Sequence, residues 1–262
     1  MEKVNVYDLD GKKKNLVDIP QLFNSKSRKD LIQMASEVAS SKNKQVQGRN
    51  KNAGLRNTAE SWGTGHEMSR APRIKGSGFS TARSVGRVPF AKGGRRAHPI
   101  KTEKNIEKKI NKKIHKLSII SAISASGDSE WVKNRGHKID KVPEIPLVID
   151  DKIQTVRKTK LIYSILTELG LKDDLIRVKK SKKTRAGKGK RRGRKYKSRK
   201  SLLIVIKDDF GIVKAARNIP GIDVVKLENL SITHLAPGGL PGRLILWAQS
   251  AFNELKKYEE LI

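Results

Sequence analysis

The run of residues 177–200 is the part of the sequence whose residue types most clearly favour a particular chemistry. Fifteen of its 24 residues are Lys or Arg, and none is acidic. Glycines alternate with these cations between Thr184 and Tyr196. Glycine lets a backbone approach a ligand closely, and Lys and Arg pair with phosphate oxygens. The planar Arg side chain can also stack on an unpaired base. The run therefore predicts contact with nucleic acid, and a solvated basic loop or a localisation signal is the simpler alternative.

The side chains of this run that are suited to contact phosphates or bases are all basic except one aromatic ring. Tyr196 could stack on a base or simply pack against the protein. The candidates are Lys182, Lys183, Arg185, Lys188, Lys190, Arg191, Arg192, Arg194, Lys195, Tyr196, Lys197 and Arg199.

A second basic segment, residues 45–101, is called the arm below. It contains 12 basic residues, two acidic ones, nine glycines and only six Ile, Leu or Val residues. So little apolar surface cannot offset the entropy lost on ordering, so we predict an extended loop that orders against a partner. A disordered linker between two domains is the alternative. The candidate contact residues are Arg49, Lys51, Arg56, Trp62, Gly63, Gly65, His66, Arg70, Arg73, Lys75, Arg83, Arg87, Lys92, Arg95 and Arg96.

The sequence from Trp62 to His66 places one large ring among glycines. A Trp in an apolar stripe is usually part of a core, but a Trp in a glycine-rich basic loop favours stacking on a base. Such stacking contributes roughly 1–3 kcal/mol per base. Phe79 and Phe90 are weaker candidates of the same kind.

Enzyme motifs that can be recognised from sequence are missing. Neither Gly187 nor Gly189 begins a phosphate-binding loop of the ATPase type, and neither opens a dinucleotide fingerprint. The sequence has no Cys, and its five His residues lack metal-ligand spacing. We therefore expect no enzyme activity, no small-molecule substrate and no cofactor. An RNA-modifying enzyme with a basic docking arm and a DNA-compacting protein remain the rival interpretations.

The charge of the whole chain also indicates a polyanionic partner. Its formal net charge is +32, and the two basic segments account for +25 of it. Such an excess repels itself unless a polyanion neutralises it, and nucleic acid is the usual one. An anionic membrane is the alternative, but the apolar runs are much shorter than the roughly 20 residues of a membrane span. The N-terminus does not resemble a signal peptide. We expect a cytoplasmic location and no membrane partner.

The elements before residue 170 are predicted from apolar spacing. Lys3 to Leu9 predicts a strand that ends in a turn at Asp10-Gly11. A helix should begin near Ser27, where Ser27 and Asp30 resemble a capping box. A second helix should run from a cap at Thr102 to Gly127. A short buried strand, residues 147–149, precedes a helix, residues 161–169.

The remaining elements are a strand at residues 202–206, a short helix at 212–216 and a strand at 224–225. Pro241 should open a final helix with an apolar stripe from Leu244 to Leu255. Apolar strands that alternate with helices predict a mainly parallel sheet covered on both faces. Because residues 1–44 are too few for a separate domain, we predict a single three-layer α/β/α domain over residues 1–262. The arm, residues 45–101, and the basic loop, residues 177–200, are inserted into it.

Several stretches resemble the universal large-subunit ribosomal protein L-four family in its archaeal and eukaryotic form. They lie in order along nearly the whole chain, which makes the resemblance specific. The stretches are residues 47–54, 61–65, 93–99, 185–194, 211–221 and 233–238.

The resemblance implies a structural constituent of the large ribosomal subunit that binds and stabilises its RNA and takes part in subunit assembly. It implies an α/β domain on the subunit surface and an arm that enters the RNA. The arm tip, Trp62, Gly63, Thr64, Gly65 and His66, would help to form the peptide exit tunnel beside ribosomal protein L-twenty-two. Members often have Arg at the position of His66, and a His is mostly neutral at cytosolic pH. Magnesium ions are expected only as part of the RNA.

Overall fold

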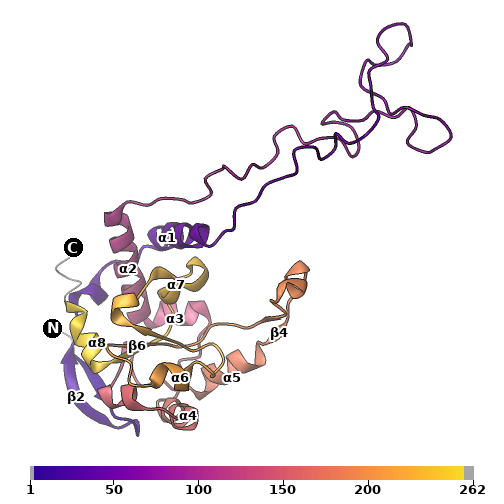
Figure 1. The fold of residues 1–262 in the computed structure, drawn as a ribbon. Helices are drawn as coiled ribbons and strands as arrows, with labels where there is room; N and C mark the ends of the chain where they lie inside the picture. The colour runs from indigo at the N-terminus through magenta and orange to yellow at the C-terminus, as the bar shows by residue number, and fades with distance from the viewer. Residues whose placement is uncertain (1–2, 257–262) are drawn as a thin grey trace. The chain divides into compact units, whose positions relative to one another are not determined.

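The computed structural model describes residues 3–256. The chain forms two compact units, one made of Met1–Lys42 and Lys108–Ile262 and the other of Asn43–Glu107. The first unit contains a six-stranded sheet of order β2-β1-β3-β8-β6-β7 (Figure 1). Its strands are β1 (Lys3–Tyr7), β2 (Lys13–Asp18), β3 (Leu147–Ile149), β6 (Leu203–Ile206), β7 (Asp223–Lys226) and β8 (Ile245–Ala248).

The sheet is parallel except at one edge. There β1 and β2 form an antiparallel hairpin, with Val4 opposite Val17. The other neighbours pair in parallel, and Val148 of β3 and Val205 of β6 both face Trp247 of β8. The predicted mainly parallel sheet is therefore confirmed.

The central strands are apolar throughout because both of their faces are covered. Every residue of β3, β6 and β8 is buried, and the Trp247 side chain is fully enclosed. The ring of Phe23 meets Trp247 edge to face, with 6.3 Å between ring centroids. Burying one large apolar side chain stabilises a fold by about 1.5–3 kcal/mol, so these strands contribute much of the core.

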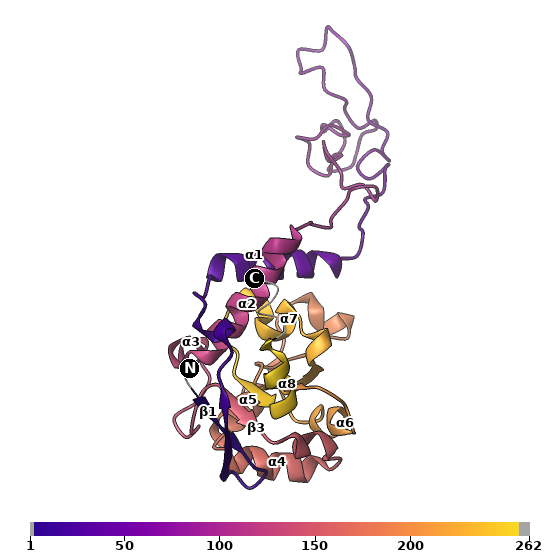
Figure 2. The same ribbon diagram turned by 90° about the vertical axis from the view of Figure 1, so that its left-hand side faces the viewer.

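Helices cover both faces of the sheet. Helices α1, α2, α3 and α7 contact one another on one side, and α4, α5 and α6 lie on the other (Figures 1 and 2). The helices are α1 (Lys29–Lys42), α2 (Lys112–Gly127), α3 (Ser129–Arg135), α4 (Thr159–Glu168), α5 (Lys172–Lys180), α6 (Ile212–Ala216), α7 (Ile232–Leu235) and α8 (Gln249–Glu254). Short 3₁₀ turns are η1 (Gln21–Asn24), η2 (Asp151–Thr155), η3 (Lys188–Arg192), η4 (Leu227–Asn229) and η5 (Pro237–Gly239).

The predicted start of the second helix at Thr102 is wrong. Helix α2 begins at Lys112, and residues 102–111 are irregular. That stretch is rich in Lys and offers little apolar surface, whereas most helical stability in proteins comes from packing an apolar face. The backbone N–H of Lys108 instead donates to Ser41 Oγ at 3.0 Å. The predicted end at Gly127 is confirmed.

The predicted final helix from Pro241 is also wrong over its first half. Residues 245–248 form strand β8, and the helix α8 begins only at Gln249. The run from Leu244 to Ala248 is unbroken and apolar, and it fits between two other buried strands. Burial on both faces decides in favour of the strand, although the spacing of the apolar residues also suits a helix.

The other predicted elements are confirmed, with small shifts of their bounds. They correspond to β1, α1, β3, α4, β6, α6 and β7. Strand β2 and helices α3, α5 and α7 were not predicted. The predicted capping box at the start of α1 is not formed as expected, because the Ser27 hydroxyl donates to Ser124 Oγ and Asp30 pairs with Arg28. Helix α4 ends before Gly170, whose φ of +78° suits glycine.

Candidate nucleic-acid interface

The most basic part of the chain forms a small hairpin, residues 183–197, called the basic hairpin below. Strand β4 (Lys183–Thr184) pairs antiparallel with β5 (Tyr196–Lys197). The Arg185 N–H donates to Lys195 O at 2.8 Å, and Arg185 Nε donates to Arg194 O at 3.1 Å. Backbone pairing and the Arg185 side chain thus hold the hairpin, and most of its other side chains point into solvent.

The predicted contact residues of this hairpin are exposed, apart from the half-buried Arg185. The ammonium groups of Lys182 and Lys195 lie 4.9 and 5.6 Å from the centre of the Tyr196 ring. Tyr196 keeps 54% of its surface exposed, so part of the ring remains open to solvent. The structure therefore gathers many cations around one exposed aromatic ring.

The first residues of the 177–200 run differ from the expected loop. Arg177, Lys179 and Lys180 belong to the last turn of α5, where cations suit the helix dipole. Arg177 turns inward and is only 12% exposed. Its Nε donates to Asp174 Oδ1 at 2.8 Å, one helical turn earlier.

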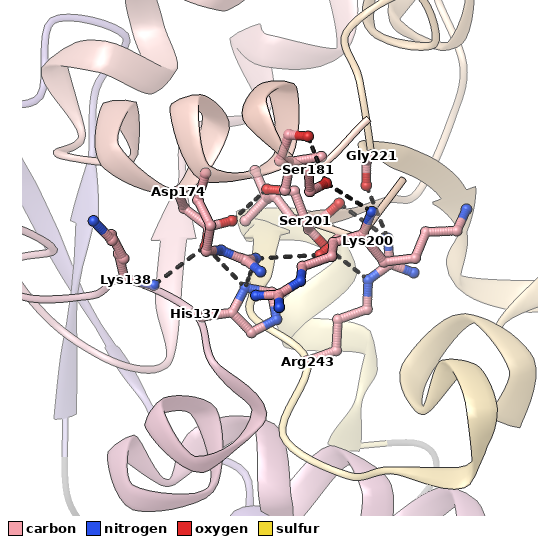
Figure 3. Close-up of polar contacts among 12 residues, drawn as sticks. His137, Lys138, Asp174, Ser181, Lys200, Ser201, Gly221 and Arg243 are labelled. Atoms are coloured by element: carbon pink, nitrogen blue, oxygen red, sulfur yellow. Dashed lines mark hydrogen bonds and ion pairs between the residues drawn. The ribbon is translucent and has the colours of Figure 1, made fainter. Parts of the chain in front are cut away.

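Asp174 is the centre of a buried polar network (Figure 3). Besides Arg177, it accepts hydrogen bonds from the Lys138 N–H and from the hydroxyl of Ser201. His137 Nδ1 lies 3.3 Å from Asp174 Oδ1 and 3.3 Å from Arg177 Nη2, so the ring packs between the two partners of this ion pair. Burial raises the pKa of Asp174, but these hydrogen bonds outweigh it and hold that pKa well below its usual range. Burial lowers the pKa of His137, so its ring is neutral at pH 7.

Arg243 is a second buried cation near this network. It is fully enclosed, and its guanidinium donates to Asp223 Oδ2 at 2.6 Å and to the backbone oxygen of Ser201 at 2.9 Å. Asp223 also binds the Lys200 ammonium, with its two oxygens at 2.8 and 2.9 Å. Arg243 was not predicted as a functional residue, although its place directly before the unbroken apolar run 244–248 is a signal of a buried, paired cation.

The carboxyl ends of the parallel strands are where α/β proteins commonly bind small ligands. In this protein the polar side chains there bind one another. Asp151 Oδ1 accepts hydrogen bonds from the Ser250 hydroxyl at 2.6 Å and from Gln154 Nε2 at 2.8 Å. Gln154 Oε1 in turn accepts from the Asp208 N–H at 3.0 Å. These groups link β3, β6 and β8 to the turns that follow them.

The arm lies within the unit Asn43–Glu107 and is built almost entirely from irregular chain. Its outgoing and returning passes run side by side, with the Arg49 N–H donating to Ile100 O at 2.9 Å (Figures 1 and 2). Gly54 lies where the two passes approach each other closely. A Cβ atom there would lie 2.5 Å from the backbone of Gly94 and Arg95, so only glycine fits.

A small backbone ladder organises the far part of the arm. Glu60 and Arg73 exchange two hydrogen bonds of 3.0 and 2.9 Å, and Arg73 also bridges to Val85. The guanidinium of Arg87 donates to the backbone oxygen of Asn57 at 2.6 Å. This ladder bounds two loops, one of which contains the predicted tip.

Three predicted arm contacts have protein partners. Arg73 donates to Arg83 O and Ser69 Oγ, Lys75 pairs with Glu60, and Arg87 bonds to Asn57. These side chains help to hold the arm in shape. The other basic candidates are exposed, namely Arg49, Lys51, Arg56, Arg70, Arg83, Lys92, Arg95 and Arg96.

At the predicted tip, the rings of Trp62 and His66 meet edge to face, with 5.5 Å between centroids. Gly63, Thr64 and Gly65 between them are exposed, and a Cβ at either glycine would meet nothing within 4 Å. Trp62 is half-buried against its own loop, and the space around the two glycines is open.

Within residues 3–256 no cluster of three or more His, Asp or Glu side chains is arranged to hold a metal ion. Nor is any helix in the described part of the chain both long and apolar enough to cross a membrane.

Comparison with known proteins gives a consistent result. Residues 17–258 match the model of the ribosomal protein L4/L1 family. The large ribosomal subunit protein uL4 of Methanococcoides burtonii is 45% identical over 98% of both chains. The uL4 proteins of Methanocaldococcus jannaschii and Methanopyrus kandleri are 42% and 40% identical, over 97% and 96% of this chain and 98% and 97% of their own. The chain belongs to the ribosomal protein L4/L1 family.

Proposed function

We propose that this protein holds folded large-subunit ribosomal RNA in place, and that the arm and the basic hairpin are the parts that contact it. Membership of the ribosomal protein L4/L1 family makes the chain a large-subunit ribosomal protein with a structural rather than an enzymatic role. The observation that carries the RNA proposal is the separation of charge. The two segments hold +25 of the net +32, and most of their basic side chains are exposed.

The proposed mechanism is neutralisation of phosphates where RNA helices converge. Exposed Arg and Lys side chains release condensed counterions when they bind phosphates, and this gives affinity with little sequence preference. Specificity would come from RNA shape and unpaired bases, for which Trp62 and Tyr196 offer rings. The protein would need no cofactor of its own, and any magnesium would belong to the RNA. It would act in the cytoplasm, without a membrane partner.

We further propose that residues 62–66 reach the wall of the peptide exit tunnel, beside ribosomal protein L-twenty-two. The family resemblance supports this placement. So does the loop itself, because Gly63 and Gly65 give it a narrow profile with few side chains.

Deletion of the arm tests this function. Nearly all of the buried apolar residues lie outside residues 45–101, so a chain in which a short Gly-Ser linker replaces the arm should fold normally. Circular dichroism would check the fold. In a strain that makes only this variant, large subunits should assemble poorly. Normal assembly with a folded variant would contradict the proposal.

Competition between nucleic acids distinguishes the DNA-binding alternative. Folded ribosomal RNA and duplex DNA of equal phosphate concentration would compete for the full chain at moderate salt. We expect the RNA to win clearly, because the contacts should depend on RNA shape. Equal competition would favour a DNA-compacting protein.

A further inference from the structure

A cationic hollow opens beside the base of the basic hairpin, outside the predicted contact residues except for Arg199. It encloses about 330 Å³ and is lined by the side chains of Arg135, His137, Arg177, Arg199 and Lys200, together with Pro237 and Leu240. A second hollow of about 520 Å³ shares Arg177 and Arg199 with the first. Its other cations are Lys180, Lys183 and Lys197. The two hollows form a continuous basic surface, called the basic channel below.

Arg135 gives the channel a charge that no carboxylate neutralises in the described structure. Its guanidinium donates to the backbone oxygen atoms of Pro237 at 2.9 Å, Pro241 at 3.3 Å and Leu240. These bonds fix the side chain but leave its positive charge in place. Burial, followed by the charges of Arg243 and Arg177, lowers the pKa of Arg135 to about 10. The group is therefore still cationic at pH 7, and an anion beside it would be favourable.

Hydrogen bonds fix the Arg177 guanidinium in the same wall of the channel. Asp174 accepts from its Nε at 2.8 Å, and its Nη2 lies 3.3 Å from both the backbone oxygen of Lys200 and His137 Nδ1. Its Nη1 has no hydrogen-bond acceptor among residues 3–256. One side of the guanidinium is thus fixed by the protein, and a donor remains for a ligand.

The nearby carboxylates do not neutralise the channel. Asp174 already forms an ion pair with Arg177, and Asp223 forms ion pairs with both Lys200 and Arg243. Arg135 and Arg199 have no ion pair within the described residues. The wall therefore carries an excess of positive charge that folding alone does not compensate.

The anion that fits this surface is a chain of phosphates. The channel has no exposed aromatic ring in its lining to hold a base, which a free nucleotide would need, and it continues from one hollow into the next. Arg side chains bind phosphate oxygens through two donors at once, and Lys adds a flexible point charge. Successive cations along a groove suit the repeated charge of a nucleic-acid backbone.

We propose that the basic channel binds successive phosphates of one RNA strand at the base of the basic hairpin. This inference rests on the proposed RNA-binding function and extends the contact surface of the basic hairpin along the α/β unit to Arg135 and Arg177. The exposed Arg199 and Lys180 are the residues to change. Neither has a side-chain ion pair in the described structure, so their loss should not unfold the protein.

The test measures binding of the full chain to a large-subunit ribosomal RNA fragment by fluorescence anisotropy over a series of salt concentrations. The double variant Arg199→Gln/Lys180→Gln is compared with a control, Lys179→Gln/Arg217→Gln. The control removes two exposed cations outside the channel, one of them adjacent in the same helix turn. In the channel variant, the slope of log K against log salt should become shallower by about 1 per cation removed. In the control the slope should stay at the wild-type value.

The outcomes separate this inference from the proposed function. If the wild-type chain fails to bind the RNA fragment, the proposed function itself is contradicted. If the wild type binds but the channel and control variants have equal slopes, only the channel inference is overturned.

Two further binding measurements identify the occupant of the channel. Labelled polyglutamate tests an acidic peptide, and the thermal midpoint in inorganic phosphate at constant ionic strength tests a free anion. If the channel variant loses polyglutamate binding or phosphate stabilisation but keeps the wild-type RNA slope, the occupant is not RNA and the inference is overturned.

Discussion

Replacing Asp174 with Ala tests whether the buried network holds the α/β unit together. Asp174 is 1% exposed and accepts hydrogen bonds from a backbone N–H, the Ser201 hydroxyl and Arg177. The substitution would leave the Arg177 guanidinium, itself only 12% exposed, without its carboxylate. Removing one partner of a buried ion pair costs about 3–5 kcal/mol. Because Arg177 keeps some contact with water, we expect a loss near the lower end, about 3 kcal/mol.

Urea unfolding, followed by circular dichroism of the full chain, measures this loss as a lower midpoint with an unchanged slope. The matched control is Asp173→Ala on the same helix. Asp173 is more exposed and pairs with Lys141 on the surface, so its variant should unfold close to the wild-type midpoint. Asp174→Asn, which keeps the shape of the side chain but not its charge, should fall between the two. Equal midpoints for Asp173→Ala and Asp174→Ala would refute the reasoning.

Three more predictions follow from the structure. Folding lowers the pKa of His137, so the unfolded chain binds more protons and the stability should fall as the pH drops through 6.5, the ordinary His value. Folding also lowers the pKa of Asp174, so the loss of stability should continue below 3.8, the ordinary Asp value. A urea midpoint that stays constant over this pH range would contradict the assignment. Gly170→Ala should lower the free energy of unfolding in urea by at least about 1–3 kcal/mol, because φ is +78° and the new Cβ would lie 2.1 Å from a backbone oxygen. The control Gly136→Ala has a φ of +93° but open space around the new Cβ, so its loss should be smaller, and equal losses would count against this reasoning. Trp62→Ala should weaken binding to ribosomal RNA by about 1–3 kcal/mol in filter binding without changing the urea midpoint, and undiminished affinity would exclude stacking.

The sequence predicted those parts of the fold in which one signal dominates. The strands at 147–149 and 203–206 are short, unbroken apolar runs with clear boundaries, and they lie at the centre of the sheet. The segment after Pro241 carried two signals at once. Leu244, Trp247, Ala248 and Ala251 have helical spacing, but residues 244–248 are also continuously apolar. Pairing with the neighbouring strands β3 and β6 makes this segment a strand rather than a helix. These strands are distant in the sequence, so the local pattern of residues 244–251 does not reveal them.

Composition was informative about the basic segments but not about their internal contacts. The excess of Lys and Arg marked the basic hairpin and the arm as exposed surfaces. It did not indicate that Arg73 and Arg87 serve the fold of the arm.

The buried network was beyond prediction for a related reason. His137, Asp174, Ser201 and Arg243 are far apart in the sequence and meet only when the sheet has formed. Even the one-turn pairing of Asp174 with Arg177 was not predicted, because the helix α5 that brings them together was not.

The most direct test of RNA binding by an inserted arm is sedimentation of the native protein after a high-salt wash. Salt screens exposed charges, with a Debye length of about 3 Å at 1 M, so a protein held only by surface electrostatics should dissociate. A protein whose arm is enclosed by folded RNA should remain bound. We predict that it sediments with the large subunit in a one-to-one ratio. Release to the top of the gradient would contradict the account.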